Sequence, residues 1–318
     1  IAPPGEVLGL ELGVVVDRDM IQNAVTTTFA ESKHLITLHF LSHVFLYGVL
    51  PSALVLWVRI RRATVLRGLI GTGLVTVLSA ALLVGLLFTN LKAYSTVLRG
   101  NKELMGSVQP LAPMSGALRY AKMMFKSTQI TLQPTGRDAK PGPFLAKADK
   151  PILMVVVAGE TSLAQNWSLG GYGRDTNPDL AKRDIVYYPN ATSCGTATAT
   201  SLPCMFSPLT RSEYSYEGGL GHENLVDVLT HAGFKVEWWD NNTGDKDIAD
   251  RIPSRKMKPE DGPEFCFPEC IDGVFLKGLQ DKADTITQNT VIVMHQIGSH
   301  GPSYWLRYPP ERELFKPA

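Results

Sequence analysis

The sequence at residues 151–162 is PILMVVVAGETS, a continuous apolar run that ends in a glycine, a carboxylate and two hydroxyl side chains. Such a run predicts a strand buried on both faces, as in a parallel sheet. Similar apolar segments follow at 234–239 (FKVEWW) and 290–294 (TVIVM), and the segment 222–233 predicts a helix that ends at Gly233. This alternation predicts an α/β domain with a mainly parallel sheet and helices on both faces.

Polar side chains follow each predicted strand at its carboxyl end, where open α/β sheets bind ligands. They are Glu160 after the first strand, the loop SCGTATATSLPC (193–204) after the apolar segment IVYY (185–188), Asp240, Asn241 and Asn242 after the third, and His295 and His300 after the last. A carboxylate, hydroxyls and histidines at one edge suit a dication such as zinc, which can activate a threonine hydroxyl. An ordinary loop rich in serine and threonine is the alternative.

The chain has four cysteines, and all of them lie in this later part. Their positions predict two local disulfides, Cys194–Cys204 and Cys266–Cys270, formed in an oxidising compartment. A zinc knuckle is the alternative, although the spacings fit paired metal ligands poorly. Closing the loop between Cys194 and Cys204 restricts the unfolded chain by roughly 3 kcal/mol and would hold a reactive hydroxyl in place.

Two segments, 35–58 and 68–89, lack formally charged side chains and are long enough to cross roughly 30 Å of hydrocarbon as helices. A buried core helix is the alternative for each. Arg59, Arg61, Arg62 and Arg67 lie between them, which predicts a cytoplasmic turn and places residues after 89 on the opposite side. The balance of 31 basic and 30 acidic residues gives no indication of nucleic-acid binding.

We therefore expect three parts: a partial transmembrane domain at 1–98 that includes a loop at 1–34, a basic linker at 99–150, and a catalytic domain at 151–318. In the linker, Leu118, Ala121, Met124 and Phe125 share one helical face, which is typical of a helix on an anionic membrane surface, although a solvated helix fits nearly as well. The chain does not begin with methionine, so we expect a fragment that starts after earlier segments.

Four segments together carry a family resemblance: VVVAGETS, GYGRDTNP, SCGTATATSLPCMFS and GSHGP. The chain resembles the bacterial lipid A phosphoethanolamine transferases, which include the mobile colistin-resistance enzymes. The resemblance implies a monomeric, multi-pass protein of the Gram-negative inner membrane with a periplasmic catalytic domain of alkaline-phosphatase type. It also implies transfer of phosphoethanolamine from the membrane lipid phosphatidylethanolamine to a lipid A phosphate through a phosphothreonine, giving polymyxin resistance.

The resemblance also assigns roles to individual residues. Glu160 corresponds to a zinc ligand, and Thr198 corresponds to the nucleophile and a second ligand. The residues that correspond to substrate-binding positions are Asn242 and Lys246 near the phosphate, His300 at the substrate or a second zinc, and Asn23, Thr27 and Glu31 at the ethanolamine head group. The last three have the Asn-x3-Thr-x3-Glu spacing, which places them on one face of a helix.

The sequence departs from the family pattern at two points. Leu163 stands where relatives often carry arginine, and the Asp-His pair that completes the family's zinc site does not occur before Ala318. We therefore expect the remaining zinc ligands beyond residue 318 and an inactive chain without them. Two other functions remain open: a membrane-anchored sulfatase or phosphoglycerol transferase of the same fold, and a catalytically silent, membrane-tethered binding protein.

Overall fold

The computed structural model of the chain describes residues 16–27, 32–58, 64–100, 111–267, 269–301 and 303–314. The chain divides into two compact units, which are described separately. Unit 1 comprises residues 1–24 and 36–122, and unit 2 comprises residues 25–35 and 123–318.

Unit 1 is helical. It contains two long apolar helices. The first runs from Leu38 to Trp57 and consists of α4 (Leu38–His43), a π-helical segment (Val44–Val49) and α5 (Leu50–Trp57). The second is α6 (Val65–Thr89). Both are long and apolar enough to cross a membrane, and none of the residues in their apolar windows is buried within the protein. Arg59, Arg61 and Arg62, on which the predicted orientation rests, lie outside the described residues.

Three further helices are α2 (Arg18–Thr26), α7 (Leu91–Gly100) and α8 (Leu111–Ser127). Of these, α2 and α8 carry segments that the sequence singled out. Helix α8 covers the predicted amphipathic segment, with Leu118 and Phe125 exposed and Met123 buried. Exposed apolar side chains of this kind suit a membrane surface, but the placement of α8 on a membrane stays a prediction.

Unit 2 is built on a four-stranded parallel sheet, as the sequence predicts. The strands are β1 (Leu153–Ala158), β2 (Lys235–Asp240), β3 (Ser254–Lys256) and β4 (Thr290–His295), in the order β1-β4-β2-β3. Ala158 and Asp240 both pair in register with His295, so β1, β2 and β4 end at the same edge. Among the strands of the described residues, the short β3 alone has no counterpart in the sequence prediction.

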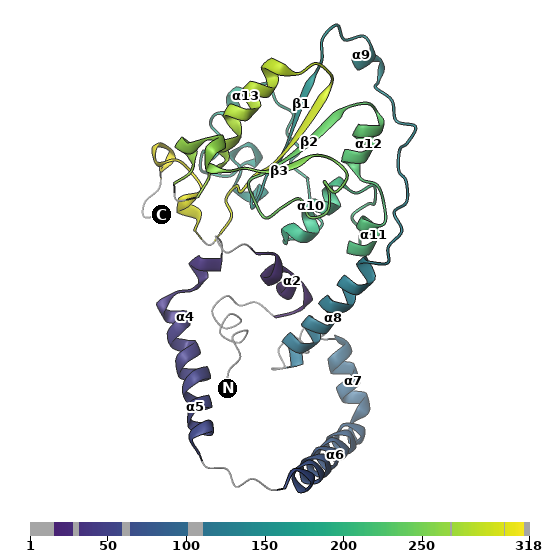
Figure 1. Ribbon diagram of the computed structural model, residues 1–318, viewed down its shortest axis with the longest axis vertical. Coiled ribbons are helices and arrows are strands. Elements are labelled where there is room, and N and C mark those ends of the chain that lie inside the picture. Colours follow the sequence, from purple (N-terminus) through teal and green to yellow (C-terminus); the bar gives the residue numbers. More distant parts are fainter. Residues whose placement is uncertain are drawn as a thin grey trace. The chain divides into compact units, whose positions relative to one another are not determined.

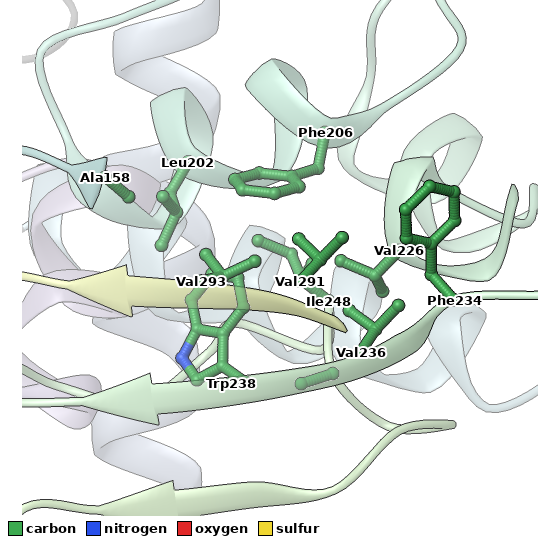
Figure 2. Packing of buried hydrophobic residues seen from close by; sticks show 11 residues of the cluster. Ala158, Leu202, Phe206, Val226, Phe234, Val236, Trp238, Ile248, Val291 and Val293 are labelled. Carbon is green, nitrogen blue, oxygen red and sulfur yellow. The ribbon is translucent and has the colours of Figure 1, made fainter. Parts of the chain in front are cut away.

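Helices cover both faces of this sheet (Figure 1). Helices α10 (Thr198–Phe206) and α12 (Leu225–His231) pack on one face, and α13 (Phe275–Thr285) packs on the other. Strand β4 alternates between the two: Val291 and Val293 contact the first layer, whereas Ile292 and Met294 contact the second. Figure 2 shows the first layer, in which Phe206 of α10 lies over Trp238 of β2.

The ends of α12 follow from its sequence. Asn224 and Asp227 form a capping box. The Asn224 side chain accepts a hydrogen bond from a backbone N–H of the first turn, and the Asp227 carboxylate accepts one from the backbone N–H of Asn224. Gly233 follows the helix with a φ of 86°, a conformation that glycine adopts without steric cost, so the helix ends where the sequence predicts. The Asp227 carboxylate also accepts two bonds of 2.7 Å from Arg251, which ties the helix to the loop before β3.

Two expectations about strands are wrong. Strand β1 is not buried on both faces, because Met154, Val155 and Val157 are 43%, 37% and 50% exposed. The reason is its position: within the described part of the chain β1 pairs only with β4 and forms an edge of the sheet. The segment 185–188 forms no strand, and Val186 and Tyr188 are exposed.

Candidate active site

Glu160 and Thr198 form the centre of the candidate site. Glu160 lies two residues beyond β1, and Thr198 is the first residue of α10. The Thr198 hydroxyl donates a hydrogen bond to Glu160, with 2.8 Å between Oγ1 and Oε2. Both residues are half-buried, so a ligand can reach the pair while the two oxygen atoms are already aligned.

The second oxygen of Glu160 is held by its neighbour Thr161. Glu160 Oε1 accepts bonds of 3.0 Å from the backbone N–H and from the hydroxyl of Thr161. Thr161 has a φ of 51°, a left-handed conformation that is unfavourable for a β-branched residue. Strained residues of this kind cluster at functional sites, and here the strained turn orients the carboxylate.

The loop that carries Thr198 is held from two directions. The disulfide between Cys194 and Cys204 joins the loop to α10, and Leu202 and Phe206 anchor α10 in the core. The structure contains both disulfides that the sequence predicts, the second one joining Cys266 and Cys270. The Thr198 hydroxyl is therefore carried on a rigid helix start, where the first backbone N–H groups of a helix favour an anion.

The Glu160–Thr198 pair fits part of a zinc site. Zinc binds carboxylate oxygen at about 2.0–2.2 Å, so two oxygen atoms 2.8 Å apart are within reach of one ion. Within the described ranges, no group of three or more His, Cys, Asp or Glu side chains is arranged to hold a metal. Glu160 and Thr198 thus offer two of the three or four protein ligands that zinc normally takes.

A second pair, of one carboxylate and one histidine, lies at the ends of β2 and β4. Nδ1 of His295 is 2.8 Å from Oδ1 of Asp240, and the two residues are only 1% and 4% exposed. Asp240 also accepts bonds from the backbone N–H groups of Asn242 (3.3 Å) and Gly244 (2.8 Å). This pair is enclosed by protein, unlike the pair of Glu160 and Thr198.

The three residues predicted to bind near the phosphate lie on the loops after β2 and β4. The buried Asn242 donates from Nδ2 to the Gln296 carbonyl at 2.8 Å, and Lys246 donates from Nζ to the Thr243 carbonyl at 2.7 Å. Nδ1 of His300 is 2.8 Å from the carbonyl of Gly301. These bonds fix the two loops, and the roles of the three residues at the phosphate stay predictions.

Lys246 lines a narrow hollow of about 60 Å³ together with Tyr214, Asp247 and Asp250. Burial, aided by the charge of Asp247, raises the pKa of Tyr214 to about 12. Burial and the nearby carboxylates of Asp247 and Asp245 also raise the pKa of Asp250. The lining also contains Arg251, so acidic and basic side chains balance in this hollow and it forms no separate anion site.

Comparison with known proteins places the chain in a family. Residues 153–318, more than half of the chain, match the sulfatase family model, and residues 9–125 match the model for phosphoethanolamine transferase EptA/EptB. The chain belongs to the sulfatase family, and its residues 9–125 are similar to the phosphoethanolamine transferases EptA/EptB. The resemblance seen in the sequence is thereby confirmed.

Individual relatives agree with this placement. The chain is 39% identical to phosphoethanolamine transferase EptA of Salmonella typhimurium over 97% of this chain and 56% of the relative. It is 36% identical to phosphatidylethanolamine transferase Mcr-1 of Escherichia coli over 96% of this chain and 58% of the relative. The chain thus spans less than two thirds of the length of these relatives.

Solved structures of the family show the same fold. The integral membrane protein lipooligosaccharide phosphoethanolamine transferase A from Neisseria meningitidis superposes with a TM-score of 0.88 at 29% identity, over 99% of this chain and 59% of that one. The soluble domain of the same enzyme gives a TM-score of 0.55 at 36% identity, over 59% of this chain and 57% of that one.

The predicted head-group residues can be followed only in part. Asn23 lies in α2, Thr27 follows the last residue of that helix, and Glu31 lies outside the described residues. The prediction that all three share one helical face therefore stays a prediction. Helix ends commonly differ by one or two residues between assignments, so the position of Thr27 does not argue against it.

Two residues that sequence reasoning missed hold the site together. Asp272 accepts bonds of 2.9 Å from the backbone N–H groups of Ile297 and Gly298, and a third from the Asn241 side chain. Gly298 has a φ of 52°, and a Cβ atom there would clash with the Glu160 carbonyl oxygen and lie 3.1 Å from the backbone C and N of Glu160. The glycine of GSHGP was a visible signal for this close approach, whereas nothing near Asp272 in the sequence indicated its partners.

Proposed function

We propose that the protein transfers phosphoethanolamine from phosphatidylethanolamine to a phosphate of lipid A, with Thr198 as the nucleophile. The observation that carries the proposal is the hydrogen bond of 2.8 Å between Thr198 Oγ1 and Glu160 Oε2 at the carboxyl edge of a parallel sheet. Family membership supports it, and so do the names of the relatives EptA and Mcr-1.

The reaction proceeds in two displacements at phosphorus. Oγ1 of Thr198 attacks the phosphorus of the donor, the bond to the diacylglycerol oxygen breaks, and the hydroxyl proton passes through Glu160 to that oxygen, which leaves as diacylglycerol. A protonated oxygen of a lipid A phosphate then attacks the same phosphorus, the bond to Oγ1 breaks, and the proton of the acceptor passes through Glu160 to Oγ1, which restores the Thr198 hydroxyl. Zinc held by Glu160 and Thr198 would lower the pKa of the hydroxyl and polarise the phosphoryl oxygen.

The surrounding residues have supporting roles in this proposal. The start of α10 binds the phosphoryl oxygens through backbone N–H groups. Asn242, Lys246 and His300 bind the same phosphate, with His300 near the substrate or a second zinc. Asn23, Thr27 and Glu31 hold the ethanolamine head group, whose ammonium requires an acidic partner such as Glu31.

The setting of the reaction follows from the helices and the disulfides. The two apolar helices support a location in the Gram-negative inner membrane, and the two disulfides support a periplasmic catalytic domain at 151–318 in a monomeric protein. Added phosphoethanolamine brings an ammonium group to lipid A. It therefore lowers the net negative charge that attracts cationic polymyxins and gives resistance to them.

Mass spectrometry tests the proposal at two points. Lipid A from cells that express the protein is expected to gain the mass of phosphoethanolamine, and Thr198 is expected to carry the same group in trapped protein. Thr198→Ala should abolish both signals, whereas Thr196→Ala, in the same loop, should retain them. Phosphoglycerol or sulfate chemistry at Thr198, or lipid A modified by Thr198→Ala, would refute the proposal.

A further inference from the structure

An uncharged hollow of about 380 Å³ lies beside Thr198. The residues that form most of its wall are Trp167, Tyr187, Tyr188, Cys194, Ser201 and Met205. Its size is within the range of small-molecule sites, which are mostly apolar with a few polar groups. None of the described residues that line it carries a formal charge.

The aromatic side of this hollow is fixed in place. The rings of Trp167 and Tyr187 are stacked, with centroids 6.2 Å apart and planes within 14° of each other. Trp167 Nε1 donates a bond of 2.7 Å to Ser162 Oγ, in the turn that follows Glu160. The wall is therefore preformed and is connected to the turn that positions the catalytic carboxylate.

The other side of the hollow exposes apolar atoms that a soluble surface normally buries. Tyr188 is 75% exposed and Met205 is 62% exposed, and Val186 beside them is also exposed. The segment 185–188 has the composition of a strand but pairs with no strand in the described part of the chain. Contiguous exposed apolar residues next to a reactive group mark a binding surface for an apolar partner.

The position of the hollow relative to Thr198 indicates which part of a substrate it can hold. Ser201 lies three residues after Thr198 on α10, so the two side chains are neighbours on the helix surface. Ser162 lies two residues after Glu160. A ligand with its phosphorus at Thr198 can therefore extend past Ser201 into the hollow with the atoms that follow its phosphate ester. In a diacyl phospholipid those atoms are glycerol, ester groups and the first methylenes, whereas in lipid A they belong to a polar sugar.

We infer that this hollow binds the glycerol backbone and the first methylenes of the acyl chains of the donor lipid. The inference rests on the proposed function, because it requires a diacyl phospholipid at Thr198. The uncharged wall accepts the ester region without leaving a buried charge unpaired, and Tyr188 and Met205 cover methylenes that would otherwise face water. The polyanionic acceptor approaches from another side of Thr198.

A photo-crosslinking experiment tests the inference with the full chain in lipid nanodiscs. The probe is phosphatidylethanolamine with a diazirine on an acyl carbon close to the ester. The label is expected within residues 185–205, and the double variant Tyr188→Ser/Met205→Ser is expected to lower it about tenfold. Leu276→Ser is the matched control, because Leu276 is also largely exposed but lies on α13, on the opposite face of the sheet.

The outcomes separate this inference from the proposed function. Label on other segments, or equal labelling of the double variant and the wild type, would refute lipid binding in the hollow even if Thr198 carried phosphoethanolamine. A phosphatidylglycerol probe with the same acyl chains is expected to label residues 185–205 as well, since the hollow does not contact the head group. Labelling of residues 185–205 without phosphoethanolamine on Thr198 would support lipid binding in the hollow and count against the proposed function.

Discussion

Two hydrogen-bonded pairs, each with one carboxylate, lie at the same edge of the sheet. The distance between the paired atoms is the same in both, yet their surroundings differ. Glu160 and Thr198 are 2.8 Å apart and half-buried, and Asp240 and His295 are 2.8 Å apart and almost completely buried. The first pair has a strained turn and a disulfide-bonded loop to hold it open to a ligand. The second has two strands, a tight turn and the ring of Trp238 around it. The open pair is accessible to a ligand, whereas the closed pair holds the edge of the sheet together.

The largest expected effects come from replacing the carboxylate of each pair with an uncharged amide. Glu160→Gln should lower the rate of lipid A modification at least about 100-fold and leave the free energy of unfolding nearly unchanged. Asp240→Asn should destabilise the fold by about 1–3 kcal/mol, because the amide keeps only one of the two oxygen atoms that His295, Asn242 and Gly244 share as acceptors. Mass spectrometry of lipid A and denaturant unfolding measure the two quantities. The reverse pattern would show that the pairs have been assigned the wrong roles.

The sequence predicted the open pair better than the closed one. Glu160 follows an apolar strand directly, and Thr198 lies in a loop with a strong family pattern, so both signals are local. The bond between Asp240 and His295 joins residues 55 positions apart and depends on which strands are neighbours. Strand order arises from long-range pairing, and no local pattern carries it.

The same limit explains the errors about strands. Residues 153–158 and 290–295 have similar apolar composition, but β4 lies between two strands and β1 lies at an edge. Composition therefore predicted the parallel sheet correctly and the burial of β1 wrongly. Segment 185–188 has strand composition too, but two of its side chains, Tyr187 and Tyr188, line the hollow beside Thr198, so its tertiary surroundings outweigh its local preference.

The two disulfides provide the second test, because one lies in the open site and the other lies beside Asn241. Replacing Cys194 and Cys204 with serine should lower the free energy of unfolding by about 3 kcal/mol, and replacing Cys266 and Cys270 should lower it by about 2 kcal/mol, since the first loop is longer. Activity should fall only with the first pair. Equal losses of activity in both variants would mean that the loop of Thr198 is not held by its own disulfide.

The two pairs also differ in the surroundings of a nearby glycine. Both have positive φ, but Gly298 approaches the backbone of Glu160, whereas space is open at the Cβ position of Gly244. Each alanine variant should cost about 1 kcal/mol from its left-handed conformation. Gly298→Ala should cost more and should also lower activity, because its Cβ displaces Glu160. Thermal unfolding and transfer assays measure both effects, and an active Gly298→Ala would mean that the turn tolerates displacement.

The smallest effect concerns a third carboxylate, Glu223, which belongs to neither pair. It accepts a backbone bond from Thr135, a bond from His231 and a bond from Arg137, and these lower its pKa to about 2. It thereby connects the segment before β1 to α12. In the unfolded chain the pKa returns to about 4.5, its value without these partners.

The sign of the pH dependence follows from this difference. A carboxyl whose pKa is lower in the folded state contributes stability above the unfolded pKa, and that contribution is lost as the pH falls from about 4.5 to about 2. Glu223→Gln should therefore be less stable than the wild type at pH 7, and the two should converge towards pH 2 in acid unfolding followed by tryptophan fluorescence. Glu213→Gln is the control: Thr210 also lowers the pKa of Glu213, but the bond spans three residues of one exposed loop. Its removal should change stability less at every pH, because no distant segments are joined there. Equal curves for the two variants would show that Glu223 contributes no more stability than the exposed loop carboxylate Glu213.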